Sequence, residues 1–126
     1  MRRVVITGLG AITPIGKTLE AYWESLKNGV SGAKEITLFD TTEFKTKFAC
    51  EVEDFKVGDY IHRREARRMD RFTHFGMIAA DEAVADSGFD LEKVNLNRVG
   101  VIFGVGLGGL ITMEEEAEKF ILGNGT

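Results

Sequence analysis

The stretch VVITGLGAITPIG, from Val4 to Gly16, is an apolar run that breaks into glycines, and such a stretch has two interpretations. A strand followed by a glycine-rich turn places backbone amides against the phosphates of a nicotinamide cofactor in the dinucleotide-binding fold. The same glycines can instead let the chain turn closely against another piece of backbone. The spacing of the glycines separates the two interpretations.

The glycine spacing does not fit a dinucleotide-binding loop. In short-chain dehydrogenases the first strand ends in TGxxxGxG, and here Thr7 and Gly8 fit but the next required glycine position is Ile12. A second glycine run, GVGLGG at 104–109, has the GxGxxG spacing directly after an apolar run. No second strand ending in an acidic residue follows it within the expected distance of about 20 residues. We therefore expect structural turns at both places and no cofactor.

Composition and charge indicate one globular domain. The chain has 126 residues, of which 44% are hydrophobic and 29% are charged. Its net charge of -4 provides no overall attraction to nucleic acid or to anionic membranes. A single cysteine excludes an internal disulfide, and neither a membrane-spanning apolar run nor a signal peptide is present in the sequence. We expect a cytoplasmic protein that binds neither nucleic acid nor membrane.

The order of the predicted elements favours an α/β fold with parallel strands. The helices are bounded by recognisable signals, because Thr18 can cap a helix that Gly29 stops, and Gly88 can stop another. In chain order the sequence predicts a strand at 4–7, a helix at 19–28, a short strand within 47–52, a long helix at about 62–87, a strand at 98–103 and a helix through the acidic run that begins at residue 114.

Several motifs in this order resemble the amino-terminal part of the β-ketoacyl-[acyl-carrier-protein] synthases, and the synthase II type most closely. They are RRVVITGLGAITPIG at 2–16, W..L..G.SG at 23–32, FDTTEF at 39–44, KFACEVEDF at 47–55, RREARRMDRF at 63–72, EAVADSG at 82–88 and RVGVIFGVGLGGL at 98–110. The resemblance implies a thiolase-like fold, of which residues 1–126 are only the amino-terminal part of the first half. The opening glycines are then turns at the end of a core strand, and no cofactor is implied.

The resemblance also implies an activity. Members of this family extend fatty acids by condensing an acyl chain, held on a cysteine as a thioester, with malonyl carried on acyl carrier protein. Two histidines promote decarboxylation of the malonyl group, and the resulting carbanion attacks the thioester. The family's cysteine, in an ACxxG motif, and both histidines lie beyond Thr126. We therefore expect a homodimeric parent enzyme and no catalytic residue within these 126 residues, which alone would be inactive.

The nucleophiles and metal ligands that the chain does contain fit structural roles better. Cys50 has no partner motif and no helix start that would activate a thiol. His62 and His74 are single histidines, and no pair of potential ligands has the spacing of a metal site. Glu114 to Glu116 form a charge run that we interpret as a solvated helix face.

The basic run HRREARRMDR, at 62–71, is the strongest candidate for a binding surface. Arg64, Arg67, Arg68 and Arg71 fall at i, i+3, i+4 and i+7, so on one helix they form a cationic stripe. The residues alone leave open a solvated face, a nucleic acid surface or a surface for an acidic protein. The resemblance implies that Arg64, Arg67 and Arg68 bind the acidic acyl carrier protein, whose carboxylates suit guanidinium groups. Arg71 departs from the family pattern and is not assigned.

Leu107, inside GVGLGG, is the candidate substrate-binding residue. The resemblance implies that it lines the acyl pocket, whereas the residue alone fits an ordinary apolar side chain over a glycine turn. Three classes of protein remain open at this point. They are a β-ketoacyl-[acyl-carrier-protein] synthase II or I, a polyketide ketosynthase or chain-length-factor subunit, and a non-catalytic module that binds an acidic protein through the arginines.

Overall fold

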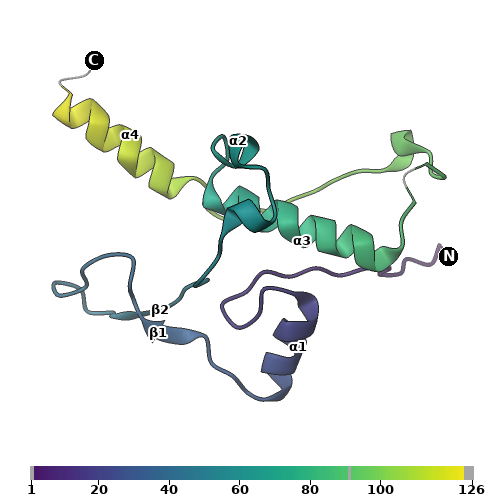
Figure 1. Cartoon of the computed structure of the whole chain (residues 1–126), viewed down its shortest axis with the longest axis horizontal. Coiled ribbons are helices and arrows are strands. Elements are labelled where there is room, and N and C mark those ends of the chain that lie inside the picture. The colour runs from purple at the N-terminus through teal and green to yellow at the C-terminus, as the bar shows by residue number, and fades with distance from the viewer. Residues whose placement is uncertain (1, 91, 124–126) are drawn as a thin grey trace. The chain divides into compact units, whose positions relative to one another are not determined.

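The computed structural model describes residues 2–90 and 92–123, and Figure 1 shows their elements. In chain order these are α1 (Leu19–Lys27), β1 (Ala33–Glu35), β2 (Phe48–Cys50), η1 (Val57–Asp59), α2 (Arg63–Ala66), α3 (Arg71–Ser87), η2 (Leu96–Arg98) and α4 (Leu110–Leu122). They divide into two compact units. The first contains Met1–Lys56 and Ile78–Phe89, and the second contains Val57–Met77 and Asp90–Thr126, so that α3 contributes to both.

Helix α1 forms as the sequence predicts. The Thr18 hydroxyl accepts a hydrogen bond from the amide of Ala21 at 3.2 Å, which satisfies one of the free donors of the first turn. The helix ends at Lys27, and Gly29 follows with a φ of 64°, a conformation that favours glycine. Both predicted boundary signals are confirmed.

Strands β1 and β2 form a two-stranded antiparallel sheet, in which Ala33 lies opposite Cys50. The prediction of a short strand within 47–52 is confirmed, whereas the parallel arrangement is wrong for the described residues.

The Nζ of Lys34 lies 2.5 Å from Oε2 of Glu53, and the hydrogen bond to Glu53 and its negative charge raise the pKa of Lys34. The pair therefore stabilises the first unit at neutral pH, and that contribution is lost as the pH rises through the raised pKa.

The opening glycines lie against α3 in the first unit. A Cβ on Gly8 would overlap the carbonyl oxygen of Ala83, and a Cβ on Gly10 would overlap that of Ala79. The interpretation of these glycines as sites of close backbone approach is confirmed.

Carboxylates of α3 accept hydrogen bonds from backbone amides of this glycine-rich stretch. The amide of Leu9 donates to Oδ2 of Asp86 at 2.9 Å, and the amide of Ala11 donates to Oε2 of Glu82 at 2.8 Å. The other Glu82 oxygen, Oε1, accepts from the amide of Leu19 at 2.7 Å. Glu82 thus joins α3, the glycine-rich stretch and the start of α1, and the amides that a cofactor phosphate would need already have an anionic partner.

The two predicted apolar strands, at 4–7 and 98–103, are not strands in this structure. Their side chains are solvated, with Val4 91% exposed and Ile102 95% exposed. A β-strand requires a neighbour that accepts its ladder hydrogen bonds, and none of the described residues pairs with either segment. Strand propensity in the sequence was therefore insufficient without a partner.

The predicted long helix at 62–87 is two helices, α2 and α3, separated by Arg67–Asp70. Asp70 is a residue type that favours helix starts, and its carbonyl accepts from the amide of His74 at 3.2 Å to begin α3. Helix α3 ends before Gly88, which has a φ of 63°, as predicted.

Apolar burial is sparse in both units. Among the described residues the buried apolar side chains are Ile61, Ala66 and Ile78. No helix in the described ranges is both long and apolar enough to cross a membrane.

Candidate functional site

The predicted partner-binding arginines lie at the end of α2. Arg64 is in the helix, Arg67 is its C-cap residue, and the amide of Arg68 donates to the carbonyl of Glu65 at 2.9 Å. All three side chains are exposed, and within the described ranges none forms an ion pair. They therefore form an available cationic surface, which we call the arginine turn.

The predicted stripe does not extend to Arg71. The break between α2 and α3 places Arg71 at the start of the next helix, where its guanidinium lies 5.1 Å from the ring centroid of Phe75. This cation–π distance gives Arg71 a local partner. The four-residue stripe on a single helix is wrong, and the three arginines of the turn are separated from the fourth.

Two histidines fix the arginine turn. The Nδ1 of His62 accepts from the amide of Arg64 at 3.3 Å as the N-cap of α2. The Nε2 of His74, on α3, lies 3.0 Å from the carbonyl oxygen of Ala66, which requires Nε2 to be the protonated nitrogen. Ala66 is itself buried. The structural roles predicted for both histidines are confirmed.

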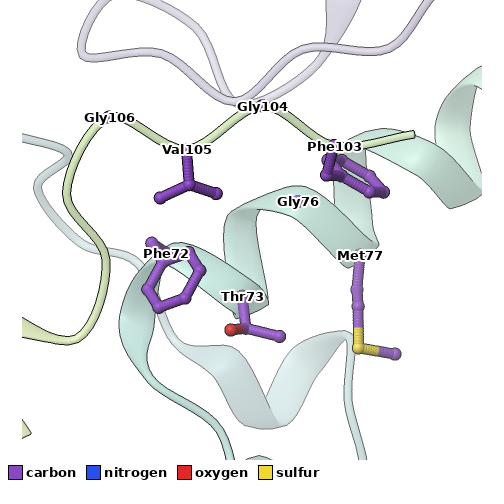
Figure 2. A pocket seen from close by; sticks show the side chains of 8 residues that line it. All are labelled: Phe72, Thr73, Gly76, Met77, Phe103, Gly104, Val105 and Gly106. Carbon is purple, nitrogen blue, oxygen red and sulfur yellow. The ribbon is translucent and has the colours of Figure 1, made fainter.

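An apolar pocket of about 490 Å³ lies in the second unit. Figure 2 shows Val105 pointing from the segment 103–106 toward Phe72 on α3, with Phe103 on the same segment near Gly76. A Cβ on Gly76 would lie 3.3 Å from the Phe103 ring, so the ring packs directly over that glycine. The full lining is Phe72, Thr73, Gly76, Met77, Phe103, Gly104, Val105 and Gly106.

Leu107 lies beside this pocket rather than in its lining. Its side chain is 73% exposed and borders a smaller depression of about 170 Å³, together with Asp70, Phe72 and Ile111. The assignment of Leu107 to an acyl pocket stays a prediction.

The glycine-rich segment Gly104–Gly109 is fixed by Asp70, Phe72 and Thr112, none of which stands out in the sequence. A Cβ on Gly108 would lie 2.8 Å from the Phe72 ring, and a Cβ on Gly109 would lie 2.9 Å from Oδ2 of Asp70. The Thr112 hydroxyl donates to Oδ1 of Asp70. No pattern in the sequence indicates this contact, because Asp70 and Thr112 are 42 positions apart.

Neither unit brings a cysteine together with a histidine among its described residues. Cys50 is an exposed free thiol on β2 in the first unit, and His62 and His74 belong to the second unit. The same ranges contain no group of three or more histidine, cysteine, aspartate or glutamate residues that could hold a metal ion. The geometry therefore offers a cationic surface and an apolar pocket, which are features of binding.

Comparison with known proteins identifies the family. Residues 1–123 match the model of the β-ketoacyl synthase N-terminal domain. The 3-oxoacyl-[acyl-carrier-protein] synthase 2 of Synechocystis sp. is 44% identical over 115 residues, which are 91% of this chain and 28% of the relative. The protein of the same name from Staphylococcus aureus strain COL is 44% identical over 113 residues, 90% of this chain and 27% of the relative. The chain thus spans little more than a quarter of these relatives.

Solved structures agree with this assignment. A β-ketoacyl synthase from Burkholderia phymatum matches with a TM-score of 0.76 and 26% identity over 100% of this chain and 31% of that one. A second match has a TM-score of 0.76 and 29% identity, over 97% of this chain and 31% of that one. It comes from a structure described as a type II polyketide acyl-carrier protein in complex with its ketosynthase bound to the hexaketide. The predicted thiolase-like fold class is confirmed. The chain belongs to the β-ketoacyl synthase family, to whose N-terminal domain residues 1–123 correspond.

Proposed function

We propose that these residues are the amino-terminal part of a 3-oxoacyl-[acyl-carrier-protein] synthase of type 2, a condensing enzyme of fatty-acid elongation. The observation that supports this most strongly is the 44% identity to synthases of that name over about nine-tenths of the chain. Because the chain covers little more than a quarter of those relatives, the proposal concerns the complete synthase.

The chemistry of the complete synthase follows three steps. A cysteine thiolate attacks the acyl carrier protein thioester, so that the acyl group moves to the enzyme and the carrier leaves as a thiol. Malonyl carrier protein then loses carbon dioxide, and its bonding electrons form a carbanion that the enzyme stabilises electrostatically. The carbanion attacks the acyl-enzyme carbonyl, forms the carbon–carbon bond and expels the cysteine thiolate. The product is the 3-oxoacyl carrier protein.

The proposed role of these residues is to bind the acyl carrier protein and the acyl chain. The arginine turn is exposed and unpaired within the described ranges, which suits docking of an acidic carrier protein. The related polyketide structure is described as an acyl-carrier protein in complex with its ketosynthase, which supports the same class of partner here. Leu107 would contact the acyl chain.

Exposed apolar segments support a larger assembly in the complete synthase. Ile6 is 80% exposed and Val101 is 78% exposed, which is unusual for apolar side chains of a finished fold. We propose that the remaining part of the synthase domain covers these segments and that the enzyme is a homodimer.

Cys50 is expected to have no part in catalysis, because it is an exposed thiol on a two-stranded sheet without a basic partner among the described contacts. In the complete synthase, Cys50→Ser should form the acyl-enzyme at the wild-type rate. Intact-mass analysis after incubation with acyl carrier protein thioester measures this, and peptide mapping locates the adduct. The isolated 126-residue chain should form none. An acyl group mapped to Cys50 at a rate matching turnover would contradict the proposal.

A polyketide ketosynthase or chain-length factor is the second candidate. The ishigamide ketosynthase/chain length factor is 43% identical over 74% of this chain and 23% of that one, with a TM-score of 0.66. The products separate the two candidates, since a polyketide enzyme retains successive keto groups on one growing chain. A chain-length factor would lack the nucleophilic cysteine and would form no acyl-enzyme by itself.

A further inference from the structure

We propose that Asp70 positions the glycine-rich segment Gly104–Gly109, and with it Leu107, and so helps to determine which acyl chains the enzyme accepts. The part that concerns acyl chains rests on the proposed function. The positioning itself rests on contacts within the second unit. Asp70 is therefore a positioning residue and not a catalytic one.

The contacts of Asp70 converge on the end of the glycine-rich segment. Its Oδ1 accepts the hydroxyl proton of Thr112, and its Oδ2 occupies the space that a Cβ on Gly109 would need. Gly109 has a φ of 70°, so a side chain there would be strained as well as obstructed. The end of the segment therefore fits against one half-buried carboxylate in one conformation.

Helix α4 begins without a side-chain cap of its own. Gly109 is the N-cap residue and provides no side-chain hydrogen bond. A carboxylate from another segment at this end also complements the partial positive charge of the helix dipole. Asp70 thus contacts the first turn of α4 through the Thr112 hydroxyl.

Asp70 lies close to Leu107. Leu107 is two residues before Gly109 and borders the same depression as Asp70. Gly108 lies between Leu107 and Gly109 in the chain and packs on the ring of Phe72. Phe72 itself follows Asp70 by two residues. Within the described ranges Leu107 itself is mostly solvated, so these neighbouring contacts, and not its own packing, set its location.

The test uses the complete synthase with three substitutions and one matched control. Asp70→Asn and Thr112→Val each weaken the side-chain contact while retaining shape, and Thr112→Ser restores the hydroxyl. Asp81→Asn makes the same chemical change at an exposed position of α3. One readout is hydrogen exchange of the amides of residues 110–113. The other is the ratio of kcat/KM for a long-chain and a short-chain acyl carrier protein.

We expect Asp70→Asn and Thr112→Val each to accelerate exchange at 110–113 and to change the selectivity ratio by about threefold to tenfold. The double variant should add little to either single variant, because both substitutions act on the same contact. Thr112→Ser and Asp81→Asn should behave as wild type in both readouts.

Two results would overturn the inference. Unchanged exchange at 110–113 in Asp70→Asn would show that the carboxylate does not fix the segment, and this readout needs no enzymatic activity. Faster exchange with an unchanged selectivity ratio would show that the position of the segment does not affect substrate choice. A wild-type protein that catalyses no condensation would instead contradict the proposed function and leave the positioning to be decided by exchange alone.

Discussion

Replacing Arg67 and Arg68 by glutamate in the complete synthase is expected to raise KM for acyl carrier protein substrates by about tenfold, with a much smaller effect on kcat. Both side chains are exposed on the arginine turn, so the substitution reverses the charge that meets an acidic partner without disturbing a packed core. Steady-state kinetics at low ionic strength measure the change. Added salt should bring the wild type closer to the variant, because screening weakens the attraction.

Two controls distinguish docking from structure. Acyl thioesters of coenzyme A need no protein docking, so their turnover should be unchanged by the reversal. Lys45→Glu with Lys47→Glu makes the same change in net charge at exposed positions of the first unit and should leave KM unaltered. Unchanged kinetics with the carrier protein at low salt would show that the arginine turn is only a solvated surface. An equal loss with both substrates would show that it is structural.

Gly10→Ala is expected to lower the free energy of unfolding of the complete synthase by about 3 kcal/mol or to leave the protein insoluble. The added Cβ would overlap the carbonyl oxygen of Ala79 and would lie 2.8 Å from the amide nitrogen of Ala83. Both are backbone atoms of α3, which cannot rotate away as a flexible side chain would. Thermal and chemical denaturation measure the effect.

Gly58→Ala is the matched control, because the same Cβ would meet no atom within 4 Å and the residue has no positive φ. It should unfold as the wild type does. A Gly10→Ala variant as stable as Gly58→Ala would contradict the close approach of the glycine-rich stretch to α3.

Local signals in the sequence predicted the helix ends well. Thr18, Gly29 and Gly88 bound their helices as expected, because capping and left-handed glycine depend on residues next to each other in the chain. The sequence also predicted that the opening glycines approach another piece of backbone, and in the structure Gly8 and Gly10 lie against α3.

Features that depend on distant residues could not be predicted in this way. Strand propensity at 98–103 is high, yet a strand forms only with a partner, and the described residues provide none. The break between α2 and α3 arises because α3 begins after Asp70. The basic run continues across this point, so the sequence predicted one long helix there. The contact between Asp70 and Thr112 joins residues 42 positions apart, and no periodic pattern in the sequence reveals it.

The most direct test of the proposed synthase activity is mass spectrometry of the condensation product. The complete synthase is incubated with an acyl carrier protein thioester and malonyl carrier protein, and the carrier-bound product and released carbon dioxide are measured together. We predict a 3-oxoacyl carrier protein lengthened by one acetyl unit, with equal amounts of carbon dioxide and product. A folded, purified protein that binds the carrier but forms neither would contradict the assignment and would identify a non-catalytic carrier-binding protein instead.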